Sequence, residues 1–100
     1  MQRGTTPTHN FTFGESLNGA KFDKIFVTYK QGEKVIVDKS AEDIEVTENS
    51  FVVKLTQAET LLFSPGLVRI QIRVKTADGN VLASNVITVP ASEILKDGEI

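Results

Sequence analysis

The stretch that decides the fold is Val68-Arg69-Ile70-Gln71-Ile72-Arg73-Val74-Lys75, in which β-branched apolar residues alternate with long polar ones over all eight positions. Successive side chains of a β-strand point to opposite faces of its sheet. The apolar members therefore face a core, whereas Arg69, Gln71, Arg73 and Lys75 form a polar stripe that faces water. We interpret the stretch as a half-buried strand.

Turn signals beside this strand and elsewhere predict β-hairpins. The alternation stops at Ala77-Asp78-Gly79-Asn80 and apolar residues resume at Val81, which is the pattern of a hairpin that turns on Asp-Gly. Gln31-Gly32 separates two further alternating runs, 22–30 and 34–39, in the same way. The sequence thus predicts at least two pairs of strands that neighbour each other along the chain.

Seven short strands are expected in all, over residues 8–13, 22–30, 34–39, 44–46, 51–55, 67–76 and 80–89, with a loop at 14–20. Strands of this length, with turns every eight to twelve residues, are typical of an immunoglobulin-like β-sandwich. The Cys and Trp anchors of antibody domains are absent. We expect one all-β domain over residues 1–100, with flexible ends at 1–7 and 91–100.

The last expected strand has an imperfect alternation. Val81, Ala83, Ile87 and Val89 share one parity, but Asn85 falls in the same register. Either Asn85 is buried and hydrogen-bonded, or a β-bulge near residue 84 changes the register. We favour the bulge, because an amide in a core is costly. Pro90 is expected to end the ladder, since it cannot donate a backbone hydrogen bond.

One short helix is predicted between the strands. Thr56-Gln57-Ala58-Glu59 fits a capping box, in which the Thr and Glu side chains each accept a hydrogen bond from an unpaired backbone amide at the helix start. Ser64-Pro65-Gly66 closes the segment, so the helix covers about residues 57–62. The spacing of Ala58, Leu61 and Leu62 predicts that these side chains face the core.

Composition limits the classes of function. The chain has 100 residues, no Cys, and a formal net charge of −2. The lack of Cys excludes disulfides, thiolate metal sites and a Cys nucleophile. An acidic balance does not favour a nucleic-acid partner, which a basic excess would attract. The sequence shows neither a signal peptide nor an apolar run long enough to span a bilayer, so we expect a protein made in the cytoplasm without a membrane partner.

Catalytic and cofactor motifs are also missing from the sequence. His9 is the single histidine and has no recognisable nucleophile or base beside it, so we interpret it as a structural side chain. The acidic run 42–48 lacks the glycine and the terminal glutamate of a calcium loop, and we interpret it as a solvated strand edge. We expect no catalytic residue, no metal and no cofactor, and hence no enzyme.

A contact surface is the remaining functional signal. The polar stripe could bind a glycan, a peptide or another protein, but a half-exposed strand carries such a stripe in any case. Phe26, Ile36 and Val52 fall on outward parities, so they form an exposed apolar patch for docking or oligomerisation unless both sheet faces are covered.

Three groups of residues carry a resemblance over nearly the whole chain. They are Thr6-Pro7-Thr8-His9-Asn10-Phe11, Leu55-Thr56-Gln57-Ala58-Glu59-Thr60, and Asp78-Gly79-Asn80-Val81-Leu82-Ala83-Ser84 followed by Ile87-Thr88-Val89. Together they resemble a family of small prophage-encoded proteins, itself similar to the amino-terminal immunoglobulin-like domain of phage baseplate upper proteins. The resemblance implies a virion-associated component of a tail or baseplate whose partners are other phage structural proteins or further copies of itself. An accessory carbohydrate- or peptide-binding module is the alternative.

Overall fold

The alternating stretch forms β6 (Gly66–Thr76) in the computed structural model, which describes residues 1–13, 21–47 and 49–100. Val68, Ile70, Ile72 and Val74 on this strand are each at most 7% exposed. β6 pairs with β2 (Phe22–Gln31) on one side, and with β7 (Val81–Ala83) and β8 (Ile87–Ala91) on the other. The prediction of a half-buried strand is confirmed. The loop expected at 14–20 lies outside the described residues.

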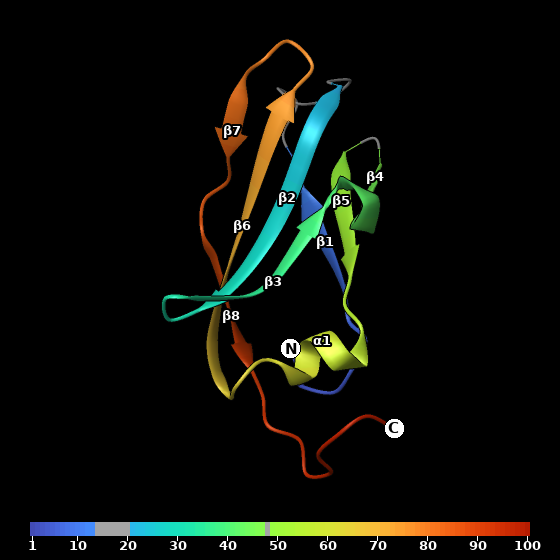
Figure 1. Cartoon of the computed structure of the whole chain (residues 1–100), viewed down its shortest axis with the longest axis vertical. Coiled ribbons are helices and arrows are strands. Elements are labelled where there is room, and N and C mark those ends of the chain that lie inside the picture. Colours follow the sequence, from blue (N-terminus) through green and yellow to red (C-terminus); the bar gives the residue numbers. More distant parts are fainter. Residues whose placement is uncertain (14–20, 48) are drawn as a thin grey trace.

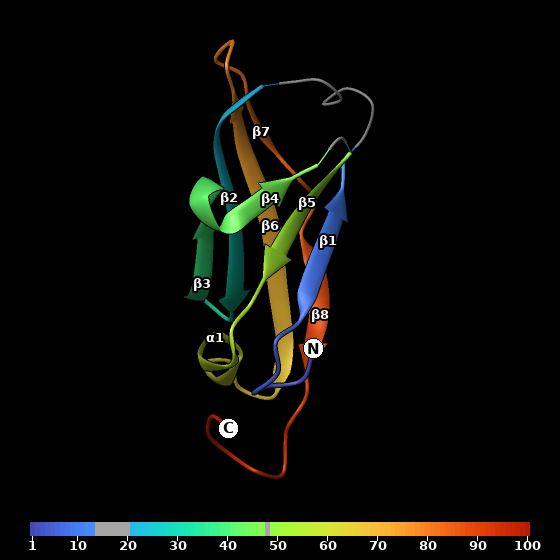
Figure 2. The same ribbon diagram turned by 90° about the vertical axis from the view of Figure 1, so that its right-hand side faces the viewer.

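The strands form two antiparallel sheets that pack face to face (Figures 1 and 2). The larger sheet has the order β3-β2-β6-β7, with β3 at Lys34–Ser40 and β8 also beside β6. The smaller has the order β1-β5-β4, with β1 at Thr8–Thr12, β5 at Ser50–Lys54 and β4 at Ile44–Val46. These orders match strands C′-C-F-G and B-E-D of the immunoglobulin fold. The predicted sandwich is confirmed.

Aromatic side chains fill much of the space between the sheets. Phe13 lies with its ring centroid 4.8 Å from that of Phe51, at one end of the core. Tyr29 on β2 is fully buried, and its ring centroid lies 6.0 Å from that of Phe63. Antibody domains carry a buried Trp on the strand that corresponds to β2. A tyrosine therefore occupies the central strand of this core, with a hydroxyl that needs a partner.

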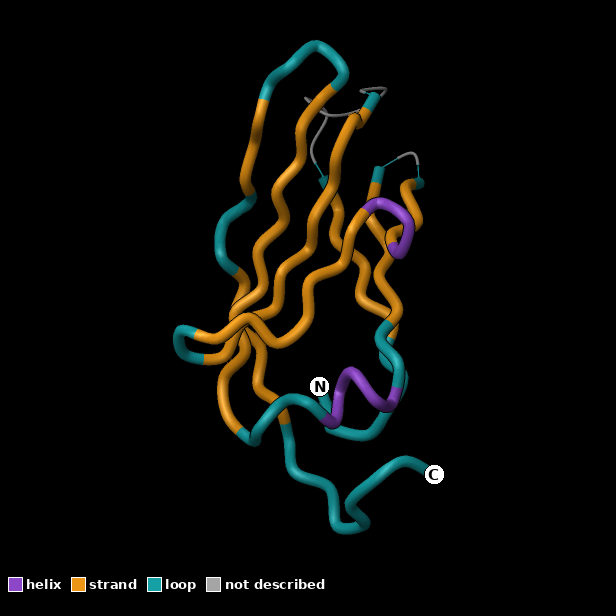
Figure 3. The backbone as a smooth tube through the Cα atoms, in the orientation of Figure 1, coloured by secondary structure: helices purple, strands orange, loops and turns teal. Residues whose placement is uncertain are grey.

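A β-bulge divides the last expected strand into β7 and β8, and Figure 3 shows the break between them as a short loop segment. Ile70 faces Ile87 and Arg73 faces Ala83, so two residues of β6 lie opposite three residues, 84–86. The expected bulge near Ser84 is confirmed, and Asn85 is exposed. The extra residue reverses the parity. The prediction that residues 81, 83, 87 and 89 share one face is therefore wrong.

Pro90 does not end the ladder, contrary to the prediction. β8 continues to Ala91, and the pairs Leu67–Pro90 and Gly66–Ala91 extend the sheet. The structure allows this because the ladder of β8 is formed with β6 on one side, and proline is tolerated on an edge strand whose missing N–H would point away from the sheet.

The predicted helix is α1 (Gln57–Leu61), and its capping box is confirmed. The Thr56 hydroxyl accepts from the Glu59 amide at 3.2 Å, and the Glu59 carboxylate accepts from the Thr56 amide at 2.9 Å. The predicted inward face is wrong, because Ala58 and Leu62 are exposed. The helix has only five residues, and Thr60 is its buried member. A single turn and a half is too short for a helical spacing rule to define a face.

The two ends of the chain run beside each other at the α1 end of the sandwich (Figure 1). Gln2 and Ser92 form a parallel bridge, and the Arg3 amide donates to the Ser92 carbonyl at 3.1 Å. The Arg3 guanidinium also donates to the carbonyls of Leu61 and Phe63. These contacts join the first residues of the chain to α1 and to the segment after β8.

Candidate interaction surface

The pairing of β2 with β6 places basic side chains in cross-strand rows on the outer face of the larger sheet. Ile25, Val27 and Tyr29 are buried on the inner face, so the alternate positions of β2 face outward. The register makes four outward rows: Lys24–Lys75, Phe26–Arg73, Thr28–Gln71 and Lys30–Arg69. We call this surface the basic face. It holds five of the eleven Lys and Arg residues of a chain whose net charge is −2.

The basic charges are close together and not neutralised within the described part of the chain. Lys24 lies opposite Lys75, and Lys30 opposite Arg69; directly opposed like charges destabilise a sheet. No carboxylate of a described residue lies within 4.0 Å of these four cations. Asp38 on β3 lies opposite Thr28 in the middle of these rows, and the Thr28 hydroxyl donates to it at 2.8 Å. The rows therefore retain a positive potential that an anionic partner would relieve.

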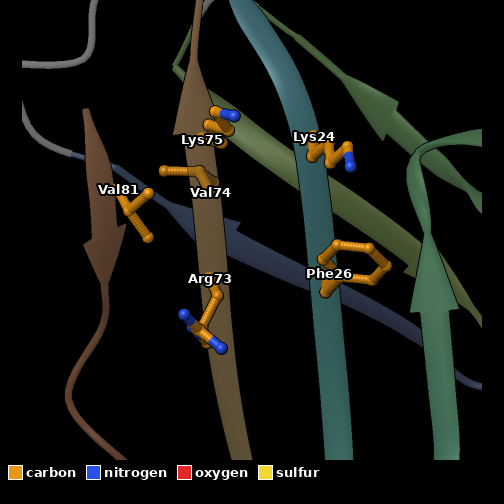
Figure 4. Close-up of a pocket in the computed structure, with 6 residues that line it drawn as sticks. All are labelled: Lys24, Phe26, Arg73, Val74, Lys75 and Val81. Carbon is orange, nitrogen blue, oxygen red and sulfur yellow. The ribbon is translucent and has the colours of Figure 1, made fainter. Parts of the chain in front are cut away.

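One end of the basic face forms a shallow hollow of about 170 Å³. Figure 4 shows its lining: Lys24 and Phe26 project from β2, Arg73, Val74 and Lys75 lie on β6, and Val81 projects from β7. Phe26 is 40% exposed and Val81 is 55% exposed. The hollow thus combines apolar contact area with three positive charges, which suits a group that carries both an apolar part and a carboxylate.

A second hollow, of about 160 Å³, follows along the same strands. Its polar lining includes Lys30, Arg69 and Gln71, and Val86 from the bulge forms one wall. The Gln71 amide donates to the Ser84 carbonyl at 3.0 Å, so this side chain is held toward the bulge. The rows from Lys24 to Lys30 extend over about 20 Å at the usual rise per residue. The basic face is therefore long enough for an extended segment of several residues.

Of the predicted surface residues, the structure brings together Phe26 and the stripe Arg69, Gln71, Arg73 and Lys75. It does not join Ile36 or Val52 to them. Ile36 is the extra residue of a β-bulge on β3, since Tyr29 faces Val37 while its neighbour Lys30 faces Val35. The bulge turns Ile36 so that it packs partly against the core.

Val52 belongs to the other sheet. It lies on β5 between Asn10 of β1 and Glu45 of β4, and it is only half-buried. The single apolar patch that outward parities predicted is therefore not formed, because parity along one strand does not report which sheet that strand joins.

Lys24 and Lys30 are functional candidates that the sequence analysis missed. Both share the parity of Phe26 on β2, which the sequence does show. Their significance depends on the register that sets them opposite Lys75 and Arg69, and this register is a tertiary property. Val81 was also missed. The prediction placed it on the same face as Ile87 and Val89, and the bulge sets it on the opposite face, beside Lys75.

Ionisable side chains inside the sandwich are paired with one another. Lys39 is 9% exposed and its Nζ lies 2.6 Å from Glu59 Oε2. Partial burial raises the pKa of Glu59, but hydrogen bonds from Lys39 and from the Thr56 amide outweigh burial and leave this pKa below its usual value. His9 Nδ1 lies 2.8 Å from the Tyr29 hydroxyl oxygen. In each pair, one side chain provides the hydrogen-bond partner that the other needs inside the sandwich.

The described residues include no group of three or more His, Asp or Glu side chains placed to hold a metal ion. α1 has five residues, and no helix in the described part of the chain is long and apolar enough to cross a membrane. Comparison of the chain with protein-family models, with curated proteins and with solved structures found no match. The basic face is thus the main candidate for a binding surface in the described part of the chain.

Proposed function

We propose that this chain is a non-enzymatic binding domain of a phage or prophage particle that acts through protein–protein contacts of its basic face. The single observation that carries the contact surface is the set of four outward rows, with five cations around the exposed Phe26. The particle context is supported by the resemblance of residues 6–11, 55–60 and 78–89 to small prophage-encoded proteins. Such a binding domain needs a rigid scaffold and an accessible face, and a two-sheet sandwich has both.

The test is whether the chain co-purifies with phage particles. Particles induced from a strain that carries the gene should contain the chain after gradient purification, measured by mass spectrometry at a fixed ratio to known particle proteins. Arg69→Glu/Arg73→Glu should reduce incorporation by at least tenfold, because two cations of the face become anions. The matched control Lys54→Glu/Lys96→Glu changes the net charge equally at two exposed residues away from the face and should be incorporated normally.

Two results would contradict this function. One is a gene neighbourhood of metabolic genes together with particles that lack the chain. The other is incorporation that Arg69→Glu/Arg73→Glu leaves unchanged, which would remove the basic face from the proposal.

The second candidate function is an accessory module that binds a carbohydrate or a peptide. The hollow between Lys24, Phe26 and Arg73 favours it, because an acidic sugar or a peptide carboxylate would meet both cations there. A glycan array that includes uronic and sialic acids tests this candidate. This candidate function predicts that the wild-type chain binds a ligand saturably and that Arg73→Glu abolishes the binding. If no ligand binds, the particle function is the better account.

A further inference from the structure

The acidic counterpart of the basic face lies on the chain itself, in the segment Ala41–Val46. Glu42, Asp43 and Glu45 are all exposed there, on a 3-10 turn at Ala41–Asp43 and on β4. Residues 40–50 include no Lys or Arg. None of the three carboxylates forms an ion pair within 4.0 Å with another described residue. We call this segment the acidic edge.

The acidic edge is held rigidly by the core beneath it. Ile44, between Asp43 and Glu45, is 7% exposed and faces Val53 of β5. Val46, at the end of β4, is 44% exposed and adds an apolar side chain to the edge. A partner that binds this segment does not have to order it first, which removes a large entropic cost of association.

The acidic edge adjoins one end of the basic face, because β3 ends at Ser40, opposite Phe26, and the 3-10 turn that follows contacts β2. In Figure 1 the acidic edge lies beside β5 at one side of the sandwich, whereas β6, β7 and the bulge lie toward the other side. Their opposite charges do not meet as ion pairs within the described part of one chain. Both sets of charges can therefore form ion pairs with a neighbouring molecule.

We propose that the basic face of one copy binds the acidic edge of a second copy. The acidic edge supplies three carboxylates for the like-charged rows Lys24–Lys75 and Lys30–Arg69, and Val46 supplies an apolar group for the hollow at Phe26. The proposal rests on the proposed function in treating the basic face as a protein-binding surface. Because the two surfaces adjoin each other, a two-fold axis can form the contact twice, face to edge and edge to face, in a closed dimer, whereas any other rotation repeats it from copy to copy.

A single-stranded nucleic acid is a less suitable occupant of the same face. Such ligands are held by successive bases stacked on several aromatic side chains. Phe26 is the one aromatic among the eight side chains of the four rows. The net charge of −2 also repels a polyanion at long range, whereas it does not prevent a short acidic segment of a second copy from docking locally.

The experiment uses the full chain and two complementary variants. The face variant is Arg73→Glu/Lys75→Glu, which keeps the acidic edge. The edge variant is Glu42→Lys/Asp43→Lys, which keeps the basic face. The control is Lys96→Glu, which reverses an exposed charge away from both surfaces. Circular dichroism checks that each chain is folded, and Arg73→Gln/Lys75→Gln replaces the face variant if charge reversal unfolds it.

Sedimentation velocity gives the result. The wild-type chain and the control should show an average mass that rises above the monomer with concentration, with an apparent dissociation constant at least severalfold weaker in high salt than in low salt, because added ions screen the contact. Each complementary variant alone should stay monomeric. An equal mixture of the two should associate again, since the unchanged face of one variant meets the unchanged edge of the other, and the reversed face and reversed edge also carry opposite charges.

Three results would overturn the proposal: a wild-type chain that stays monomeric at every concentration at low salt, variants that still associate alone, or a mixture that does not associate. A labelled single-stranded oligonucleotide that binds the wild-type chain but not the face variant, while the wild type stays monomeric, would assign the face to nucleic acid instead. These measurements use purified protein only. A chain that self-associates as described but is missing from particles contradicts the proposed function and leaves this inference intact.

Discussion

His9 and Tyr29 show how one buried hydrogen bond links the fold to pH. Burial, followed by the positive charge of the amino terminus, lowers the pKa of His9, and burial raises the pKa of Tyr29 above its usual value. The tyrosine hydroxyl therefore stays protonated, and the neutral imidazole can accept a hydrogen bond from it at Nδ1, 2.8 Å away. A protonated imidazole has no acceptor to offer at this position.

Acidification should therefore destabilise the protein through His9. In the unfolded chain the pKa of a histidine is about 6.5, and in the folded chain the pKa of His9 is lower. Below about pH 6.5 the unfolded state binds more protons, so the free energy of unfolding falls as the pH drops toward the folded-state pKa. Urea unfolding between about pH 7.5 and about pH 5.5 measures this slope.

His9→Asn is the matched variant, since its amide can still meet the Tyr29 hydroxyl but does not titrate. It should show a flatter dependence of stability on pH than the wild-type chain over the same range. Equal slopes in the two proteins, or a wild-type chain that gains stability on acidification, would assign the pH dependence to other groups.

Among the elements, β6 is the strand on which the larger sheet depends, because it pairs with β2 on one side and with β7 and β8 on the other. Ile70 is 2% exposed at its centre. Ile70→Ala should lower the free energy of unfolding by about 2–5 kcal/mol, because neighbours on both sides prevent the strand from closing the cavity. Chemical denaturation measures the loss. Lys75→Ala on the outer face is the control and should stay within about 0.5 kcal/mol.

The bulge between β7 and β8 is held against β6 by two hydrogen bonds of Ser84. The Ile72 amide donates to the Ser84 hydroxyl at 3.0 Å, and the Ser84 amide donates to the Ile72 carbonyl at 2.8 Å. Ser84→Ala leaves the Ile72 amide without its acceptor and should cost about 1–3 kcal/mol in thermal or urea unfolding.

Ser84→Thr keeps the hydroxyl and Asn85→Ala alters an exposed neighbour, so both should remain close to the wild-type stability. If Ser84→Ala proved as stable as Asn85→Ala, water would have to satisfy the Ile72 amide, and the bulge would be set by the backbone alone.

For the whole molecule, the decisive contacts are those that tie the ends of the chain to the body. The Arg3 guanidinium donates through Nη2 to the Leu61 carbonyl at 3.1 Å, and through Nε to the Phe63 carbonyl. It thereby satisfies carbonyls at the end of α1. Arg3→Lys should cost about 1–2 kcal/mol, because a lysine has one ammonium in place of the planar fork.

The melting temperature measures this loss of stability, and limited proteolysis measures how firmly residues 1–7 are held. Gln2→Ala, at an exposed neighbouring position, is the control and should change neither. If Arg3→Lys leaves both unchanged, the amino-terminal segment is held by its other contacts, such as the backbone bridge to Ser92 and the hydrogen bond from the Thr60 hydroxyl to the Thr5 carbonyl.

The sequence by itself determined the strands, their hairpins, the capping box and the bulge near Ser84, because each depends on side chains within a few residues of one another. The stripe on β6 was visible for the same reason. The tertiary structure alone decided which strands share a sheet, that Ile36 and Val52 do not join Phe26, and that Lys24 and Lys30 face Lys75 and Arg69. Side-chain alternation reports only that a strand has two faces, whereas the charge of a sheet surface depends on the register between strands far apart in the sequence.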